Sequence, residues 1–172
     1  DAIKHGMGFV PEDRKEQGLI LEMTVRYNLC LPGLDQFHPN GIISDRKEEE
    51  VADRFIKALD IRTPSQDQLV LNLSGGNQQK VVLSKWLAIE PRILILDEPT
   101  RGIDVATKKE IHRIISELAG QGVGIVLISS ELPEILAMSD RIIVMHEGEK
   151  KGEFGREEAS QEKIMAAALQ NV

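Results

Sequence analysis

Two short motifs in the middle of the chain carry residue types suited to phosphate chemistry. Residues 73–80 read Leu-Ser-Gly-Gly-Asn-Gln-Gln-Lys, and residues 93–100 read Ile-Leu-Ile-Leu-Asp-Glu-Pro-Thr. The apolar spacing after Gly76 predicts a helix that begins at Ser74, and the unpaired first-turn amides of a helix attract anions. The second motif predicts a buried strand that ends in two carboxylates, one suited to Mg²⁺ and one to the attacking water. Together the motifs indicate a site that handles a nucleotide phosphate.

Each motif also has a plainer interpretation. Serine is a favoured N-cap residue, so Ser74-Gly75-Gly76 alone is compatible with an ordinary helix start. Asp97 could equally be a capping residue at the end of a strand, which would leave Glu98 as an exposed acid. The longer string through Gln79 favours the phosphate interpretation of the first motif, whereas Pro99-Thr100 only predicts a turn and agrees with either interpretation.

The elements that must position these motifs follow from the hydrophobic pattern. Short apolar runs predict strands at 7–10, 92–97, 123–128 and 141–146, with a tight turn at 147–148 and a possible return at 151–154. Apolar stripes at helical spacing predict helices from Ser74 to Leu87, over 106–118, over 132–137 and from Ser160 to Leu169. Residues 20–72 predict a mainly helical lobe, with helices over 25–29 and from Ser44. This alternation favours an α/β fold with a parallel sheet covered on both faces.

Composition excludes several classes of protein. The chain has 172 residues, of which 41% are hydrophobic and 28% charged, and a net charge of −7 argues against a dedicated nucleic-acid binder. The single cysteine, Cys30, excludes a disulfide within the chain, and no apolar run reaches the roughly 18 residues that span a membrane. The pair Arg14-Lys15 is expected to be solvated. The start at Asp1 indicates a piece of something longer.

The combination of the two motifs resembles the ATP-binding cassette (ABC) ATPases. The Leu-Ser-Gly-Gly-x-Gln-Gln string is similar to their signature motif, and the strand ending Asp-Glu-Pro-Thr is similar to their Walker B strand. The flanking segments 10–15, 99–105 and 129–134 resemble the second cassette of double-cassette ATPases that drive monosaccharide import, of the ribose, galactose and xylose type. The resemblance extends over essentially the whole chain.

The resemblance implies a P-loop NTPase (RecA-like) ABC ATPase core, with a mostly parallel sheet and an inserted helical subdomain, truncated before the P-loop strand. Residues 1–172 would form a partial ABC ATPase domain. The helical subdomain would cover about residues 20–73, and residues 1–19 and 74–172 would form the α/β core and the C-terminal tail. The missing strand would lie between 123–128 and 141–146. The chain is therefore expected to exchange elements with a second copy or to be only marginally stable.

The resemblance also implies roles for individual residues. In the signature loop, Ser74, Gly75, Gly76, Asn77 and Gln78 would contact the γ-phosphate of ATP held by the opposite cassette. Asp97 would be the Walker B acid that holds Mg²⁺, and Glu98 would be the catalytic glutamate. Ser130 would occupy the switch position, Glu12 the Q-loop position, and Asp104 the D-loop at the interface between cassettes.

Three departures from the family pattern bear on activity. None of the 14 glycines is followed by lysine, so the chain contains no Gly-x-x-x-x-Gly-Lys-Ser/Thr phosphate loop. Most cassettes carry histidine where this chain has Ser130, and a hydroxyl cannot take up a proton near neutral pH as imidazole does. Glu12 replaces the usual glutamine, and its carboxylate would repel phosphate oxygens unless Mg²⁺ or a basic group intervenes.

The resemblance therefore implies an ATP- and Mg²⁺-dependent module that energises import of a ribose-like monosaccharide at the cytoplasmic face of the membrane. Its expected partners are a second cassette, membrane permease subunits and, indirectly, a periplasmic or extracellular sugar-binding protein, with no role for nucleic acid. The chain alone is expected to hydrolyse ATP poorly or not at all. The alternative is a catalytically inactive module that docks a partner cassette or permease. A soluble ABC protein acting in translation or DNA repair is a weaker option, because the chain has no basic arm or coiled-coil insertion.

Overall fold

The computed structural model describes residues 2–38, 41 and 44–169, and the chain divides into two compact units. The first unit is Asp1–Ile128 and the second is Ser129–Val172. The domain expected over the whole chain includes residues 1, 39–40, 42–43 and 170–172, which lie outside the described residues.

The first unit is built on a parallel sheet of three strands in the order β1-β2-β3. The strands are β1 (Met7–Val10), β2 (Ile93–Asp97) and β3 (Gly124–Ile128). Val10 pairs with Leu96, and Asp97 pairs with Ile128, so the carboxyl ends of the strands lie side by side. The strands predicted at these positions and the mostly parallel α/β class are confirmed.

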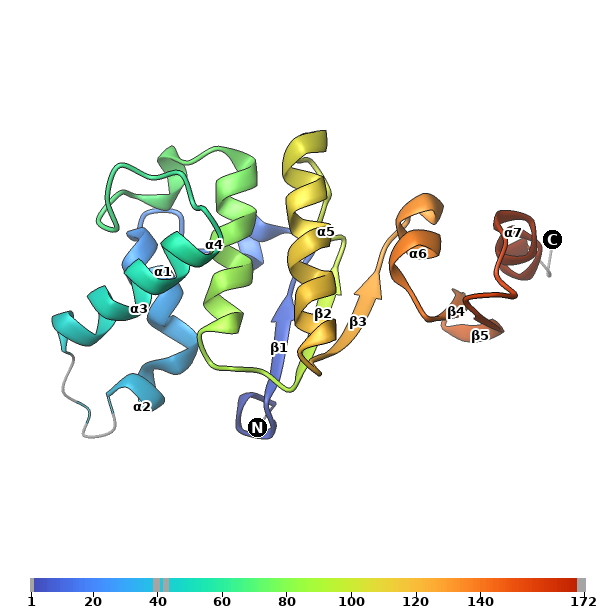
Figure 1. Cartoon of the computed structure of the whole chain (residues 1–172), viewed down its shortest axis with the longest axis horizontal. Coiled ribbons are helices and arrows are strands. Elements are labelled where there is room, and N and C mark those ends of the chain that lie inside the picture. Colours follow the sequence, from blue (N-terminus) through green and yellow to red (C-terminus); the bar gives the residue numbers. More distant parts are fainter. Residues whose placement is uncertain (1, 39–40, 42–43, 170–172) are drawn as a thin grey trace. The chain divides into compact units, whose positions relative to one another are not determined.

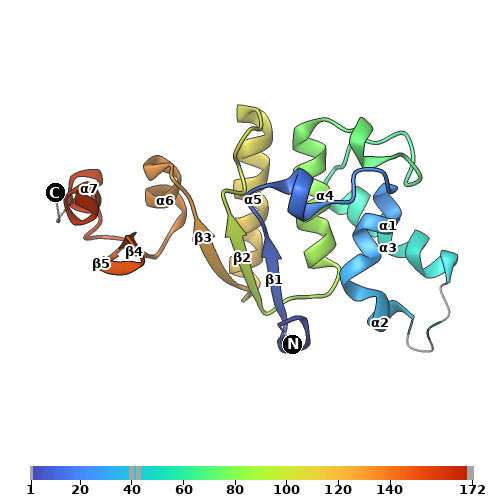
Figure 2. The ribbon, with the colours of Figure 1, turned by 180° about the vertical axis from the view of Figure 1, so that it is seen from behind.

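Two long helices cover one face of this sheet. Helix α4 (Gly75–Leu87) precedes β2 and α5 (Val105–Gly120) follows it, and Figures 1 and 2 show both on the same side of the strands. The expectation of helices on both faces is wrong for this unit. Both crossovers step in one direction along the sheet, so a right-handed path places both helices on the same face. The other face leaves Phe9, Val126 and Ile128 42%, 48% and 48% exposed.

The predicted helices of residues 20–72 pack beside α4, away from the sheet (Figure 1). Thr24 caps α1 (Val25–Cys30) by accepting a hydrogen bond from the Tyr27 amide at 3.2 Å. Helix α1 contacts α3 (Asp45–Ala58), and Leu29 of α1 and Ala52 of α3 are both fully buried. The remaining elements of the unit are α2 (Leu34–Phe37), the 3₁₀ turns Ile3–His5, Leu31–Gly33 and Val70–Asn72, and a π-helical turn at Arg14–Gly18.

The second unit is an antiparallel hairpin between two helices along the chain. Its elements are α6 (Leu132–Met138), β4 (Arg141–His146), β5 (Glu149–Gly155) and α7 (Gln161–Leu169). Glu147 and Gly148 both have positive φ, 49° and 79°, as a two-residue hairpin turn requires. The core of the unit consists of Ile142, Val144, Ile164 and Ala167. The predicted helices, strand and returning strand are therefore confirmed.

The difference between the two sheet faces makes a prediction about stability. Replacing the fully buried Leu96 with alanine should lower the free energy of unfolding by about 2–5 kcal/mol, because it leaves a cavity between β2 and the helices. Ile128→Ala, on the neighbouring strand, removes a side chain that is already 48% exposed and should cost well under half as much. Urea unfolding of both variants checks this, and equal losses would contradict the assignment of the covered face.

Candidate functional site

The candidate site lies where the carboxyl ends of the three parallel strands meet the starts of α4 and α5. In open parallel sheets this edge is where ligands bind, because loops leave the strands there and helix N-termini point toward it. The turn after β1 brings Glu12 and Arg14 to this edge, and the turn after β2 brings residues 98–104 to the same edge. All of these residues belong to the first unit.

Asp97 and Glu98 end β2 in a sharp turn. Asp97 is the last strand residue and is half-buried, as is Glu98. Glu98 has φ of 45°, which is uncommon for a residue with a side chain and is typical of strained functional positions. Its amide donates to the Ile128 carbonyl at 2.9 Å, and its carbonyl accepts from the Arg101 amide at 3.1 Å. The acid therefore sits in a turn whose backbone is held at both ends.

The start of α4 has the geometry of both an N-cap and an anion site. Ser74 Oγ accepts from the Asn77 amide at 3.4 Å and from Asn77 Nδ2 at 3.0 Å, so the plainer N-cap interpretation holds. Ser74 nevertheless remains exposed. Asn77 Oδ1 accepts from the Arg62 amide at 2.8 Å, and the buried Gln78 donates through Nε2 to the Val70 carbonyl at 3.1 Å. Asn77 and Gln78 thus hold the loop before the helix, while Ser74 faces solvent.

Glycines at positions 75 and 76 allow α4 to approach its neighbours closely. A Cβ on Gly76 would lie 2.8 Å from both Cγ2 and Oγ1 of Thr107, and one on Gly75 would lie 2.9 Å from Arg14 Nη2. Only glycine gives the backbone this clearance. The signature-like loop is therefore packed directly against the start of α5 and the arginine that follows β1.

Asp104 caps α5. Its carboxylate accepts from the Thr107 amide at 3.0 Å and from the Thr107 hydroxyl at 2.7 Å. These two bonds, the amide bond first, lower the pKa of Asp104 below the ordinary carboxyl value. The structure brings Asp104 to the same edge as the signature-like loop, with its carboxylate engaged in the cap.

Glu12 and Arg14 both contact Arg101, which follows β2. The Glu12 carboxylate forms an ion pair with the Arg101 guanidinium, and Arg14 Nη1 donates to the Arg101 carbonyl at 3.0 Å. The sequence expectation that Arg14 is solvated is wrong, because its side chain is half-buried between two parts of the site. No local pattern marks Arg14, since its partner is 87 residues away in the sequence.

Ser130 belongs to the second unit, where it is exposed and lies just before α6. The structure brings together the predicted residues of the first unit: Glu12, Ser74, Gly75, Gly76, Asn77, Gln78, Asp97, Glu98 and Asp104.

The strand-end carboxylate fits Mg²⁺ as a partial ligand set. Within residues 2–38, 41 and 44–169, no group of three or more His, Cys, Asp or Glu side chains could hold a metal. Magnesium is commonly bound through one or two carboxylates together with phosphate oxygens and water. Asp97 at the end of β2 fits that pattern, with the phosphates of a nucleotide as the missing ligands.

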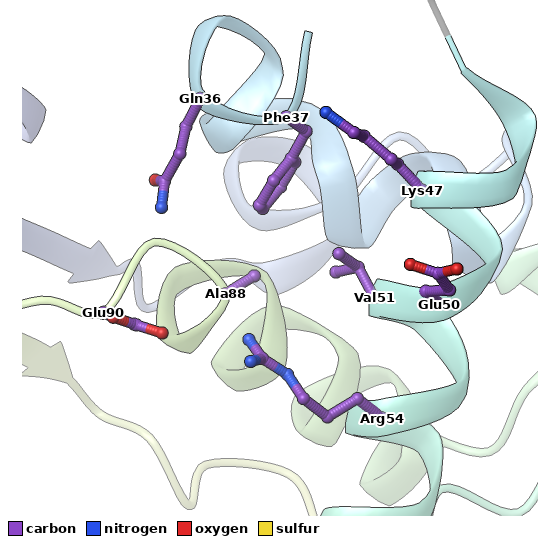
Figure 3. Close-up of a pocket in the computed structure, with 8 residues that line it drawn as sticks. All are labelled: Gln36, Phe37, Lys47, Glu50, Val51, Arg54, Ala88 and Glu90. Carbon is purple, nitrogen blue, oxygen red and sulfur yellow. The ribbon is translucent and has the colours of Figure 1, made fainter.

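A separate hollow lies at the other end of α4. It has a volume of about 420 Å³ and is lined by Gln36, Phe37, Lys47, Glu50, Val51, Arg54, Ala88 and Glu90. Figure 3 shows these side chains converging from α2, α3 and the C-terminal end of α4. The hollow shares no residue with the candidate site, which contacts the N-terminal end of the same helix.

Among the described residues, no helix is long and apolar enough to cross a membrane.

Comparison with known proteins identifies the class. The family model described as ABC transporter matches residues 1–101, so the chain belongs to the ABC transporter family. The chain is similar over 98% of its length to the ribose import ATP-binding protein RbsA of Bacillus subtilis (53% identical) and to the xylose import ATP-binding protein XylG of Geobacillus kaustophilus (56% identical). It spans about a third of each relative, 34% and 33% respectively.

Solved structures confirm the cassette fold. The chain matches the dimeric structure of a post-hydrolysis state of the ATP-binding cassette MJ0796 bound to ADP and Pi, with a TM-score of 0.76 and 25% identity. That match covers 89% of this chain and 64% of the cassette. The predicted ABC ATPase fold of the P-loop NTPase class is therefore confirmed.

The packing of Gly76 against Thr107 makes a second prediction. Gly76→Ala should lower the free energy of unfolding by about 1–3 kcal/mol, because the hydrogen-bonded Thr107 side chain cannot move aside cheaply. Gly120→Ala, at the end of α5 with open space around it, should be neutral or slightly stabilising. Equal effects of the two variants in urea unfolding would contradict the close approach.

The Asp104 cap makes a prediction about pH. Since the pKa of Asp104 is lowered in the folded state, its stabilisation is present above the ordinary carboxyl pKa of about 3.9 and is lost as pH falls through the folded value. The stability gap between wild type and Asp104→Ala should therefore be widest near pH 6–7 and shrink on acidification. Thr107→Val removes the hydroxyl donor and keeps the amide donor. In the Thr107→Val background, Asp104→Ala should therefore cost less stability than it does in the wild type. Urea unfolding across the pH range measures both, and a gap independent of pH would contradict the prediction.

Proposed function

We propose that this chain is an ATP-handling module of an ABC-type sugar importer, contributing the signature loop, the Walker B strand and the D-loop. One observation carries the proposal. The exposed Ser74 at the start of α4, the Asp97-Glu98 strand end and the capped start of α5 converge at one edge of the sheet. The similarity to ribose and xylose import ATP-binding proteins supports a ribose-like monosaccharide as the cargo.

The signature loop acts on a nucleotide held by another cassette. Ser74, Gly75 and Gly76 offer a hydroxyl and first-turn amides at the positive end of a helix, and these donors stabilise charge on the γ-phosphate of ATP. Asn77 and Gln78 act by holding the loop in shape, because their amide groups bond to Ser74, Arg62 and Val70. In this arrangement the binding groups come from the backbone and one serine.

The strand-end acids serve the hydrolytic step. Asp97 would hold Mg²⁺, which would supply positive charge against the phosphates, and Glu98 would orient or deprotonate the attacking water. Ser130 contributes a hydrogen bond at the switch position. Arg101 supplies the basic group that Glu12 requires beside phosphates, since their ion pair offsets the acidic charge. Asp104 serves the interface between cassettes by fixing the start of α5.

These proposed residue roles imply which other proteins the chain works with. The chain needs a second cassette that supplies a phosphate loop, and the dimeric structures of the related cassette MJ0796 support that pairing. Membrane permease subunits and, indirectly, a sugar-binding protein complete the importer, with this module at the cytoplasmic face. The sequence contains no Gly-x-x-x-x-Gly-Lys-Ser/Thr, so the chain alone should bind ATP weakly and hydrolyse it poorly or not at all.

Two experiments test the proposal. Titration calorimetry of the purified chain with MgATP should detect no binding tighter than the millimolar range. A chimera of the Bacillus subtilis relative, with its matched third replaced by this chain, should hydrolyse ATP. Ser74→Ala in the chimera should lower the rate about tenfold or more, because it removes a donor to the γ-phosphate. Glu98→Gln should lower hydrolysis at the site that holds Glu98.

Ser65→Ala is the matched control, since Ser65 is exposed in a loop of the same unit and lies outside the site. It should leave the rate of the chimera unchanged. A chimera that folds and binds ATP while Ser74→Ala and Glu98→Gln leave its rate intact would favour the inactive docking module instead. Micromolar binding of ATP to the chain alone would overturn the role of the loop as an element acting on a partner's nucleotide.

A further inference from the structure

Arg101 is held at two points by the turn that follows β1. Its guanidinium pairs with the Glu12 carboxylate, and its carbonyl accepts from Arg14 Nη1 at 3.0 Å. The two partners, Glu12 and Arg14, are two residues apart in the chain, so a single segment contacts both the side chain and the backbone of Arg101. We call Glu12, Arg14 and Arg101 the Arg101 latch.

The segment that carries the latch is itself fixed. The Asp13 carboxylate accepts from the amides of Lys15 and Glu16 at 2.9 and 3.1 Å, which caps the π-helical turn starting at Arg14. Arg14 Nε is buried, and within the described part of the chain it has no hydrogen-bond partner. The guanidinium is therefore packed into the protein, with its ends rather than its Nε directed at the site.

Arg101 connects the latch to Glu98 through a backbone hydrogen bond. Its amide donates to the Glu98 carbonyl at 3.1 Å, and the Glu98 amide donates to Ile128 at 2.9 Å. The strained turn at Glu98 is thus held by β3 on one side and by the latch on the other. Gly102, with φ of 67°, follows Arg101 directly, so the latch also sets where the Gly102–Asp104 loop begins.

Arg14 touches the signature loop as well. A Cβ on Gly75 would lie 2.9 Å from Arg14 Nη2, and one on Gly102 would lie 3.8 Å from both terminal nitrogens. One guanidinium therefore fills the space between the start of α4 and the turn after β2. Its planar fork can bond one element while packing on the other, which a lysine ammonium cannot reproduce.

We infer that Glu12 and Arg14 are positioning residues that set Glu98 and the Gly102–Asp104 loop relative to Ser74, acting through Arg101. This inference rests on the proposed function for its catalytic meaning and on the contacts alone for its structural meaning. Glu12 thereby acts on the protein rather than on a phosphate. Global stability does not explain the pair, because Glu12 and Arg101 side chains are 46% and 67% exposed and such ion pairs contribute little.

Hydrogen exchange on the 172-residue chain tests the structural part. In Arg14→Gln, amides of residues 98–104 should exchange about tenfold faster, the loss expected when one hydrogen bond from a charged donor is removed. Glu12→Gln should give a smaller increase in the same segment. Amides of β5, in the other unit, should not change, and the melting temperature should fall by no more than about 6 °C, the shift that the loss of one such bond produces. Lys15→Gln, beside Arg14 and exposed, is the control and should leave residues 98–104 unchanged.

Unchanged exchange at residues 98–104 in both Arg14→Gln and Glu12→Gln would overturn the latch. So would an equal rise across the whole first unit, since that reports general destabilisation. Arg14→Lys should restore part of the protection, because it keeps one donor toward the Arg101 carbonyl and loses the fork.

Kinetics of the Bacillus subtilis chimera test the catalytic part. Arg14→Gln should lower kcat about tenfold with KM for ATP within about twofold, and Arg14→Lys should recover part of kcat, because the latch aligns the acid rather than binding the nucleotide. A changed KM with unchanged kcat would overturn the positioning role. Absence of ATP hydrolysis by the unmutated chimera would count against the proposed function alone, because hydrogen exchange decides the latch independently.

Discussion

The close approach of α4 to α5 is the constraint on which the site depends. The two helix starts meet where Gly76 faces Thr107, and a single added methyl carbon would lie 2.8 Å from the threonine side chain. Because no side chain separates the two helix starts, the loop that carries the exposed Ser74 lies close to the loop that leads into α5. The neighbouring Gly75 leaves room for the Arg14 guanidinium. Without both glycines, the Thr107 and Arg14 side chains would have to shift to keep the loop before α4 this close to the loop after β2.

Charge at this edge is balanced largely within the protein. An acidic chain with a net charge of −7 has to present carboxylates near a phosphate without repelling it. Glu12 is paired with Arg101, and the Asp104 charge is met by the amide and hydroxyl of Thr107. The strand-end acids Asp97 and Glu98 keep a position suited to a metal and a water. The carboxylates therefore divide into those that hold the scaffold and those to which the proposed function assigns chemistry.

Local patterns in the sequence were sufficient to locate the elements. The apolar runs of β2 and β3, the stripe of α5 and the caps at Thr24, Ser74 and Ser160 each depend on neighbours within about one or two turns. The sequence did not predict that α4 and α5 share one face. That arrangement follows from the order β1-β2-β3, since two right-handed crossovers stepping in the same direction must lie on the same side.

The sequence by itself determined the class of the protein and the residue types of the site. The signature-like and Walker B-like strings name Ser74, Asp97 and Glu98 because their motifs are contiguous. Only the tertiary structure decided what Glu12 and Arg14 contact, since both reach Arg101 in a distant part of the sequence. Arg14 reaches a carbonyl 87 residues away, and no local pattern encodes such a partner. A contact of that kind exists only after the sheet has brought the turns after β1 and β2 together.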